Sequence, residues 1–84
     1  MFVLIVEIFE YKNGKVTSLE KKNECFNTYQ KAEDRLDRYL EVYAPFKIEY
    51  EDSFTVLNIY DSYKDDANLV KKFYLQIIEV EAEK

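Results

Sequence analysis

The chain has 84 residues, which fits a single domain over 1–84, and its content of 48% hydrophobic and 17% aromatic residues is well above that of a disordered chain. Seventeen acidic and twelve basic residues give a net charge of -5, which disfavours binding to nucleic-acid phosphates and to anionic membranes. Histidine is absent, and cysteine and glycine occur once each, which excludes histidine-based nucleophilic triads, an ordinary zinc site and glycine-rich phosphate loops.

The first predicted strand covers 2–11, a stretch rich in β-branched and aromatic residues. Its apolar side chains fall on both faces, which is typical of a strand in the middle of a sheet. Asn13-Gly14 follows and predicts a tight hairpin, because both residues tolerate positive φ. The second strand, about 15–24, is polar and lysine-containing, a pattern that favours a sheet edge.

One helix is predicted next, with Asn27 or Thr28 as its N-terminal cap. Charged residues cover most of its surface, and the apolar residues recur at helical spacing to form one stripe. The stripe contains Ala32, Leu36, Tyr39, Leu40 and Tyr43. Pro45 cannot continue a helix, so we expect the helix to end near Tyr43 or Ala44.

Three further strands are predicted in the second half of the chain. Residues 46–51 alternate between apolar and charged, as in a strand buried on one side. A tight turn at 52–53 leads to a strand over 54–60. The polar stretch 61–68 is expected to form a loop or one or two helical turns, and the last strand, about 72–80, is apolar on both faces.

These elements predict an α+β domain with the order ββαβββ. The first and last strands are both apolar on two faces, so we expect them to pair at the centre. The resulting five-stranded sheet has the order 2-1-5-4-3, with every neighbouring pair antiparallel and one helix packed on one face.

The second face of this sheet has no predicted element to cover it. We expect the alternate set of the first strand to point away from the helix, together with apolar residues of the last strand. The predicted interaction face comprises Val3, Ile5, Phe9, Tyr11, Phe73, Leu75 and Ile77. So much apolar surface exceeds what monomers usually expose. It predicts a homodimer contact, a contact with another protein, or coverage by the segment 61–70.

The leading interpretation is a non-catalytic protein-interaction domain that acts through this aromatic and apolar face. A narrower version is an acidic inhibitor that offers its carboxylates to a basic partner. The alternative is a small-molecule-binding domain that holds its ligand with tyrosines between helix and sheet. RNA bases also stack on exposed aromatic residues of a sheet, but the acidic charge opposes that interpretation.

No enzyme activity, cofactor or metal is expected. Asp61, Asp65 and Asp66 cluster in a polar loop, but they lack the spacing and the glycine of a calcium-binding loop. The single cysteine, Cys25, can form no disulfide within the chain and favours a reducing compartment. The apolar residues 2–6 are interrupted by Glu7 and resemble neither a signal peptide nor a membrane span. We therefore expect a cytoplasmic protein.

Overall fold

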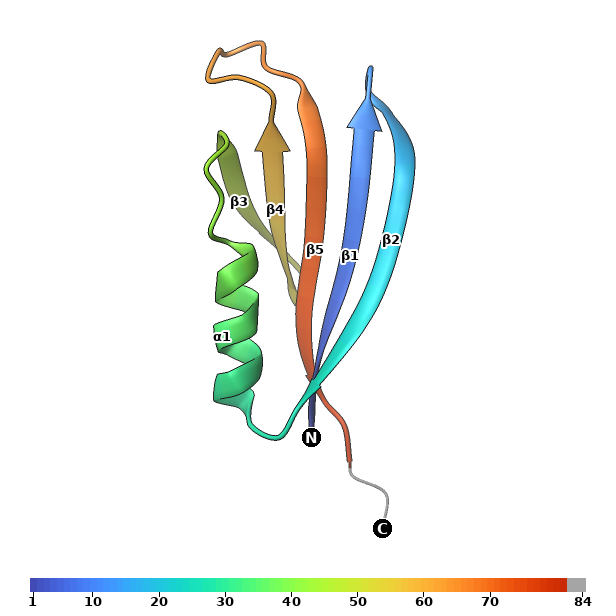
Figure 1. The fold of residues 1–84 in the computed structure, drawn as a ribbon, viewed down its shortest axis with the longest axis vertical. Coiled ribbons are helices and arrows are strands. Elements are labelled where there is room, and N and C mark those ends of the chain that lie inside the picture. Colours follow the sequence, from blue (N-terminus) through green and yellow to red (C-terminus); the bar gives the residue numbers. More distant parts are fainter. Residues whose placement is uncertain (82–84) are drawn as a thin grey trace.

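A computed structural model describes residues 1–81 and shows an antiparallel sheet with one helix against it (Figure 1). The elements are β1 (Phe2–Lys12), β2 (Lys15–Phe26), α1 (Tyr29–Tyr39), β3 (Phe46–Glu51), β4 (Phe54–Tyr60) and β5 (Leu69–Glu79). The five strands are arranged in the order β2-β1-β5-β4-β3, and all neighbouring pairs are antiparallel. The predicted fold class and strand order are therefore confirmed.

The β1–β2 hairpin turns at Asn13-Gly14, as predicted. Their φ angles of 54° and 76° are both positive, which is the conformation that a tight hairpin turn requires. β2 extends to Phe26, two residues beyond the predicted end, and all but two of its twelve residues are exposed. This strand forms one edge of the sheet.

The helix begins as predicted but ends early. The Lys31 backbone N–H donates a hydrogen bond of 3.2 Å to Oγ1 of the capping residue Thr28. The last helical residue is Tyr39, whereas the prediction extended the helix to Tyr43 or Ala44. The early end of the helix has a topological reason. Helix α1 contacts β1, β2 and β5, and the chain must then cross to β3 at the opposite edge of the sheet. Residues 40–45 provide that crossing.

The core lies between α1 and the three long strands. Leu4, Val6 and Leu75 have no exposed surface and form its centre, and Ala32 of α1 is also fully buried. Partly buried apolar side chains surround this centre: Ile8, Phe26, Leu36, Tyr39, Leu40, Phe73 and Ile77. Four residues of the predicted helix stripe, Ala32, Leu36, Tyr39 and Leu40, therefore lie against this core as predicted. Tyr43, the fifth, lies beyond the helix and is fully exposed, so its assignment to the stripe is wrong.

The face assigned to the last strand was wrong. The sequence predicts Phe73, Leu75 and Ile77 on the open side of the sheet, but all three belong to the core beside α1. Residues directly opposite each other in an antiparallel pair project to the same face. The pairs that share the helix side are Leu4 with Ile77, Val6 with Leu75 and Ile8 with Phe73.

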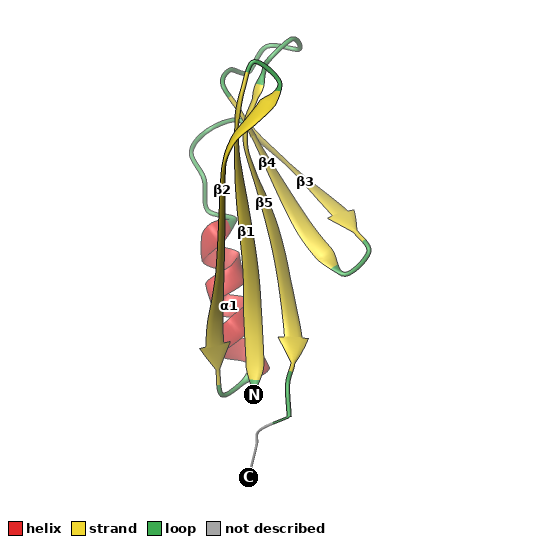
Figure 2. Ribbon diagram, turned by 90° about the vertical axis from the view of Figure 1, so that its right-hand side faces the viewer, coloured by secondary structure: helices red, strands yellow, loops and turns green. Residues whose placement is uncertain are grey.

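The β3–β4 hairpin diverges from the rest of the sheet. Strand β4 pairs with β5 only from Thr55–Leu75 to Tyr60–Leu69, so the remainder of β5 has β1 as its single neighbour. Figure 2 shows the hairpin leaning to the side opposite α1. The molecule measures 51 × 22 × 21 Å, an elongated shape that follows from the long β1–β2 hairpin.

The segment between β4 and β5 does not cover the sheet. Tyr63 donates a hydrogen bond of 3.3 Å from its hydroxyl to the Tyr43 carbonyl, and the segment borders a hollow with Pro45 and Phe46. It forms turns and no helix, and β5 begins at Leu69, three residues before the predicted start. The segment 61–70 therefore does not cover the side of the sheet that points away from α1.

Within the described part of the chain, no helix has the length and apolar character needed to span a membrane.

Candidate interaction face

The open face is the side of the sheet that points away from α1. Strand pairing defines it, because Val3 lies opposite Ile78, Glu7 opposite Tyr74 and Phe9 opposite Lys72. Its apolar and aromatic members with exposed surface are Val3, Ile5, Phe9, Tyr11, Val16, Leu19, Phe54, Tyr74 and Ile78. Val56 lies on the same side of the sheet but is buried. Side chains from four strands therefore contribute to one surface.

The structure places four of the seven predicted face residues here. Val3, Ile5, Phe9 and Tyr11 of β1 alternate along the open face, and each remains partly exposed. Leu19 lies opposite Phe9 on the neighbouring edge strand with 49% of its surface exposed. Neither α1 nor the 61–68 segment covers these residues, so the open face is accessible.

Tyr74 and Ile78 are the β5 residues that sequence reasoning missed. Both alternate sets of this strand are rich in apolar residues, and hydropathy alone did not separate them. Polar residues do not separate the two sets either, because Lys72 and Gln76 belong to the set of Tyr74, whereas Lys71 and Glu79 belong to the set of Phe73. Phe54 was also missed, because its position beside Tyr74 depends on the register of β4 with β5.

Three aromatic rings from three strands meet at the centre of the open face. The Tyr74 ring lies 5.5 Å from that of Phe9 and 5.9 Å from that of Phe54, centroid to centroid. The interplanar angles of 74° and 86° are edge-to-face arrangements, which aromatic pairs favour. These contacts join β1, β5 and β4 across the line where the sheet diverges.

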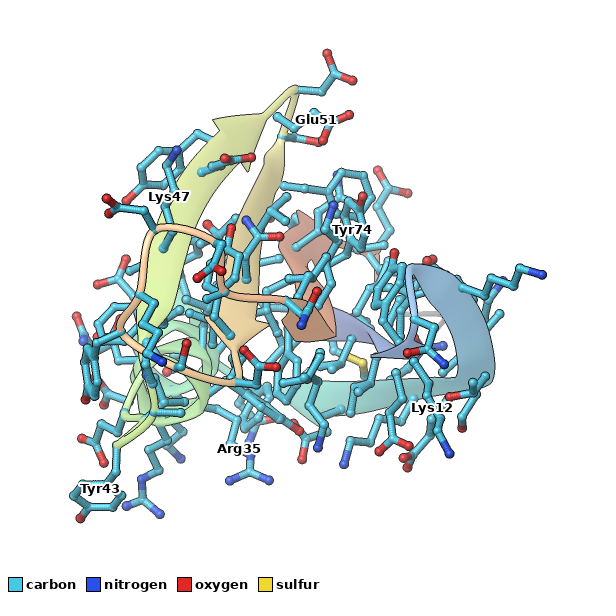
Figure 3. All side chains as sticks on the ribbon, turned by 90° about the horizontal axis from the view of Figure 1, so that it is seen from above. Lys12, Arg35, Tyr43, Lys47, Glu51 and Tyr74 are labelled. Atoms are coloured by element: carbon cyan, nitrogen blue, oxygen red, sulfur yellow. The ribbon has the colours of Figure 1, made fainter. Side chains whose placement is uncertain are left out.

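A hollow of about 280 Å³ adjoins these rings. We call it the aromatic hollow, and it is lined by Glu7, Phe9, Glu51, Asp52, Phe54 and Tyr74. Glu51 and Asp52 reach it from the end of the β3–β4 hairpin, where Asp52 adopts a φ of 55° that aspartate tolerates better than most residues. Figure 3, viewed along the long axis, shows Glu51 and Tyr74 on the side of the molecule away from Arg35 of α1.

The carboxylates of the aromatic hollow have no salt-bridge partner among residues 1–81. The ion pairs in this part of the chain join Arg35 to Glu24, Lys47 to Glu49 and Lys71 to Glu10. A cation is nevertheless close, because Lys72 Nζ lies 5.6 Å from the centroid of the Tyr74 ring. The hollow therefore combines aromatic rings with carboxylates that no lysine or arginine neutralises directly.

The cations on the helix side have structural roles. Arg35 Nε donates hydrogen bonds of 3.1 Å to both carboxylate oxygens of Glu24, and this contact ties α1 to β2. The hydrogen bond and the charge of Glu24 raise the pKa of Arg35. Lys22 and Arg35 lie 5.7 Å and 5.0 Å from the Tyr39 ring centroid. Tyr39, the tyrosine between helix and sheet, is thus already surrounded by protein groups, including the Phe73 ring at 6.0 Å.

The acidic loop has a structural role at one position. Asp61 accepts hydrogen bonds from the backbone N–H of Asn68 at 2.9 Å and from its side-chain amide at 3.3 Å, which closes the segment between β4 and β5. Across residues 1–81, no group of three or more histidine, cysteine, aspartate or glutamate side chains forms a potential metal site.

Comparisons of this chain with protein-family models, with curated proteins and with solved structures give no match.

Proposed function

We propose that this domain is a non-catalytic protein-interaction module that binds its partner through the open face. The observation that carries the proposal is the partly exposed row Val3, Ile5, Phe9 and Tyr11 on a sheet face that the chain's only described helix does not cover. Apolar and aromatic residues gathered on one accessible surface are typical of a binding interface.

Strand pairing also places Lys21, Lys47 and Lys72 on the open face, so this face as a whole is not acidic. The aromatic hollow and the whole chain are acidic, and this favours a different protein over a second copy of this chain. Three unneutralised carboxylates line the aromatic hollow, and the whole chain carries a net charge of -5. Two copies meeting face to face would bring these carboxylates together, and like charges at an interface oppose association. A partner with a basic contact surface gains from the same carboxylates, which agrees with an acidic inhibitor of a basic protein.

A matched pair of variants tests the proposal by capture from cells of the source organism. Ile5→Lys places a charge on the open face outside the aromatic hollow, and Asp37→Asn changes the net charge equally on the exposed side of α1. We expect wild type and Asp37→Asn to retain the same partner and Ile5→Lys to lose it, with both variants folded by circular dichroism. A partner retained by folded Ile5→Lys would contradict the proposal.

Light scattering coupled to size-exclusion chromatography tests whether the open face binds a second copy of this chain or a different protein. We expect a monomer at all concentrations, because the carboxylates of the aromatic hollow oppose contact between two copies of the chain. A dimer that Ile5→Lys dissociates would show that the open face instead binds a second copy.

A further inference from the structure

We infer that the aromatic hollow receives an arginine side chain of the partner protein. This inference rests on the proposed function, because it names the group that the open face recognises. It depends on three features: the aromatic rings, the free carboxylates and the size of the hollow.

The rings provide the first feature. A cation is attracted to the face of an aromatic ring when it lies within about 6 Å of the centroid. Phe9 and Phe54 contact Tyr74 in edge-to-face arrangements, so the three rings do not stack on one another. Lys72 Nζ lies 5.6 Å from the Tyr74 centroid, so Tyr74 already contacts a cation of the protein itself, and the rings left for an incoming cation are those of Phe9 and Phe54.

The carboxylates provide the second feature. Glu7 comes from β1, whereas Glu51 and Asp52 come from the β3–β4 hairpin, so acidic groups approach the hollow from two separate elements. None of the three forms a salt bridge within the described residues. A guanidinium group has five N–H donors in a fixed plane, so it can stack on a ring and donate to carboxylates at the same time.

The size of the hollow is the third feature. At about 280 Å³ it lies just below the range of pockets that enclose small-molecule ligands, about 300–1,000 Å³. One side chain inserted from a protein surface fits such a space. Arginine is favoured over lysine because an ammonium group cannot combine planar stacking with paired hydrogen bonds.

The test uses N-acetyl-arginine methylamide as the probe and the citrulline analogue, which has the same shape without the charge, as the control. Both are titrated into the ¹⁵N-labelled full chain, and amide shifts are followed by NMR. We expect saturable shifts at Glu7, Phe9 and Tyr74 with the arginine probe and none with citrulline. In about 0.5 M NaCl, where the Debye length is about 4 Å, the affinity is expected to fall severalfold.

Conservative variants then test the carboxylates. The combined substitution Glu7→Gln, Glu51→Gln and Asp52→Asn keeps the size of each side chain, and Asn tolerates the positive φ at position 52. We expect this variant to bind the arginine probe at least about threefold more weakly, from the low end of the range measured for three exposed ion pairs. Glu41→Gln, on the exposed end of the α1 region, is the charge control and is expected to bind normally.

The outcomes separate this inference from the proposed function. Equal binding of arginine and citrulline, or unchanged affinity in the triple variant, would overturn the arginine site. If the arginine probe also fails to shift the hollow while Ile5→Lys still abolishes partner capture, the interaction face stands and the arginine site falls. N-acetyl-lysine methylamide is titrated in the same way, and stronger binding of this lysine analogue than of the arginine probe would contradict the preference for a guanidinium group.

Discussion

Neighbouring residues of β1 give a sharp test of which face of the sheet is covered. Leu4 has no exposed surface and lies in the core beneath α1, whereas Ile5 points to the open face and remains partly exposed. Truncating a fully buried leucine to alanine costs about 2–5 kcal/mol, through lost transfer free energy and the cavity that remains. We expect about 3 kcal/mol for Leu4→Ala and about 1 kcal/mol for Ile5→Ala, since a partly exposed side chain gives up less burial.

The expected difference is large for a domain of this size. With about 0.05–0.15 kcal/mol per residue, 84 residues give a free energy of unfolding of about 4–13 kcal/mol. Since 1 kcal/mol changes the Tm of such a domain by about 4–8 °C, Leu4→Ala should lower it by about 12–24 °C. Ile5→Ala should lower it by about 4–8 °C.

Urea unfolding followed by circular dichroism measures both variants, and equal slopes confirm that the free energies are comparable. The reasoning is refuted if Ile5→Ala costs as much as Leu4→Ala at low protein concentration, because Ile5 would then be as deeply covered as Leu4. Should the excess cost of Ile5→Ala appear only at high concentration, the cover is a second copy of the chain.

Three further substitutions test other parts of the structure. Phe73→Lys places a charge in the core and should unfold the domain, whereas Tyr74→Lys, one residue on, should leave it folded; the reverse result would contradict the observed register. Gly14→Ala should lower the free energy of unfolding by about 1–2 kcal/mol, because the site is sterically open and only its positive φ strains the new side chain. An unchanged free energy of unfolding would exclude the tight turn. Glu24→Gln should weaken the contact between α1 and β2 and lower the Tm slightly in low salt, and an equal loss in high salt would show that charge is not its cause.

Local patterns in the sequence were sufficient for most of the fold. Asn13-Gly14 determined the first hairpin, and the apolar stripe from Ala32 to Leu40 determined the buried side of the helix. The strand order followed from two strands that are apolar on both faces, since only central positions bury both. These features are encoded by residues close together in the chain, which is why sequence reasoning found them.

Long-range geometry was harder to predict. The helix stripe continued to Tyr43, but the distance between α1 and the far edge strand required residues 40–45 to leave the helix. In β5 both alternate sets are apolar, so the face of Phe73 depended on the register with β1 and could not be read from hydropathy. The aromatic hollow depends on the registers of β1 with β5 and of β5 with β4, which place Asp52 and Phe54 around the same hollow as Glu7 although no local motif links them.

The most direct test of the open face is photo-crosslinking in cells of the source organism. A benzophenone amino acid replaces Ile5 in one variant and Asp37, exposed on α1, in a second variant. If the open face binds a partner, irradiation gives one discrete adduct from position 5 and none from position 37. Adducts from position 37 alone, or none from a folded variant labelled at position 5, would contradict the account.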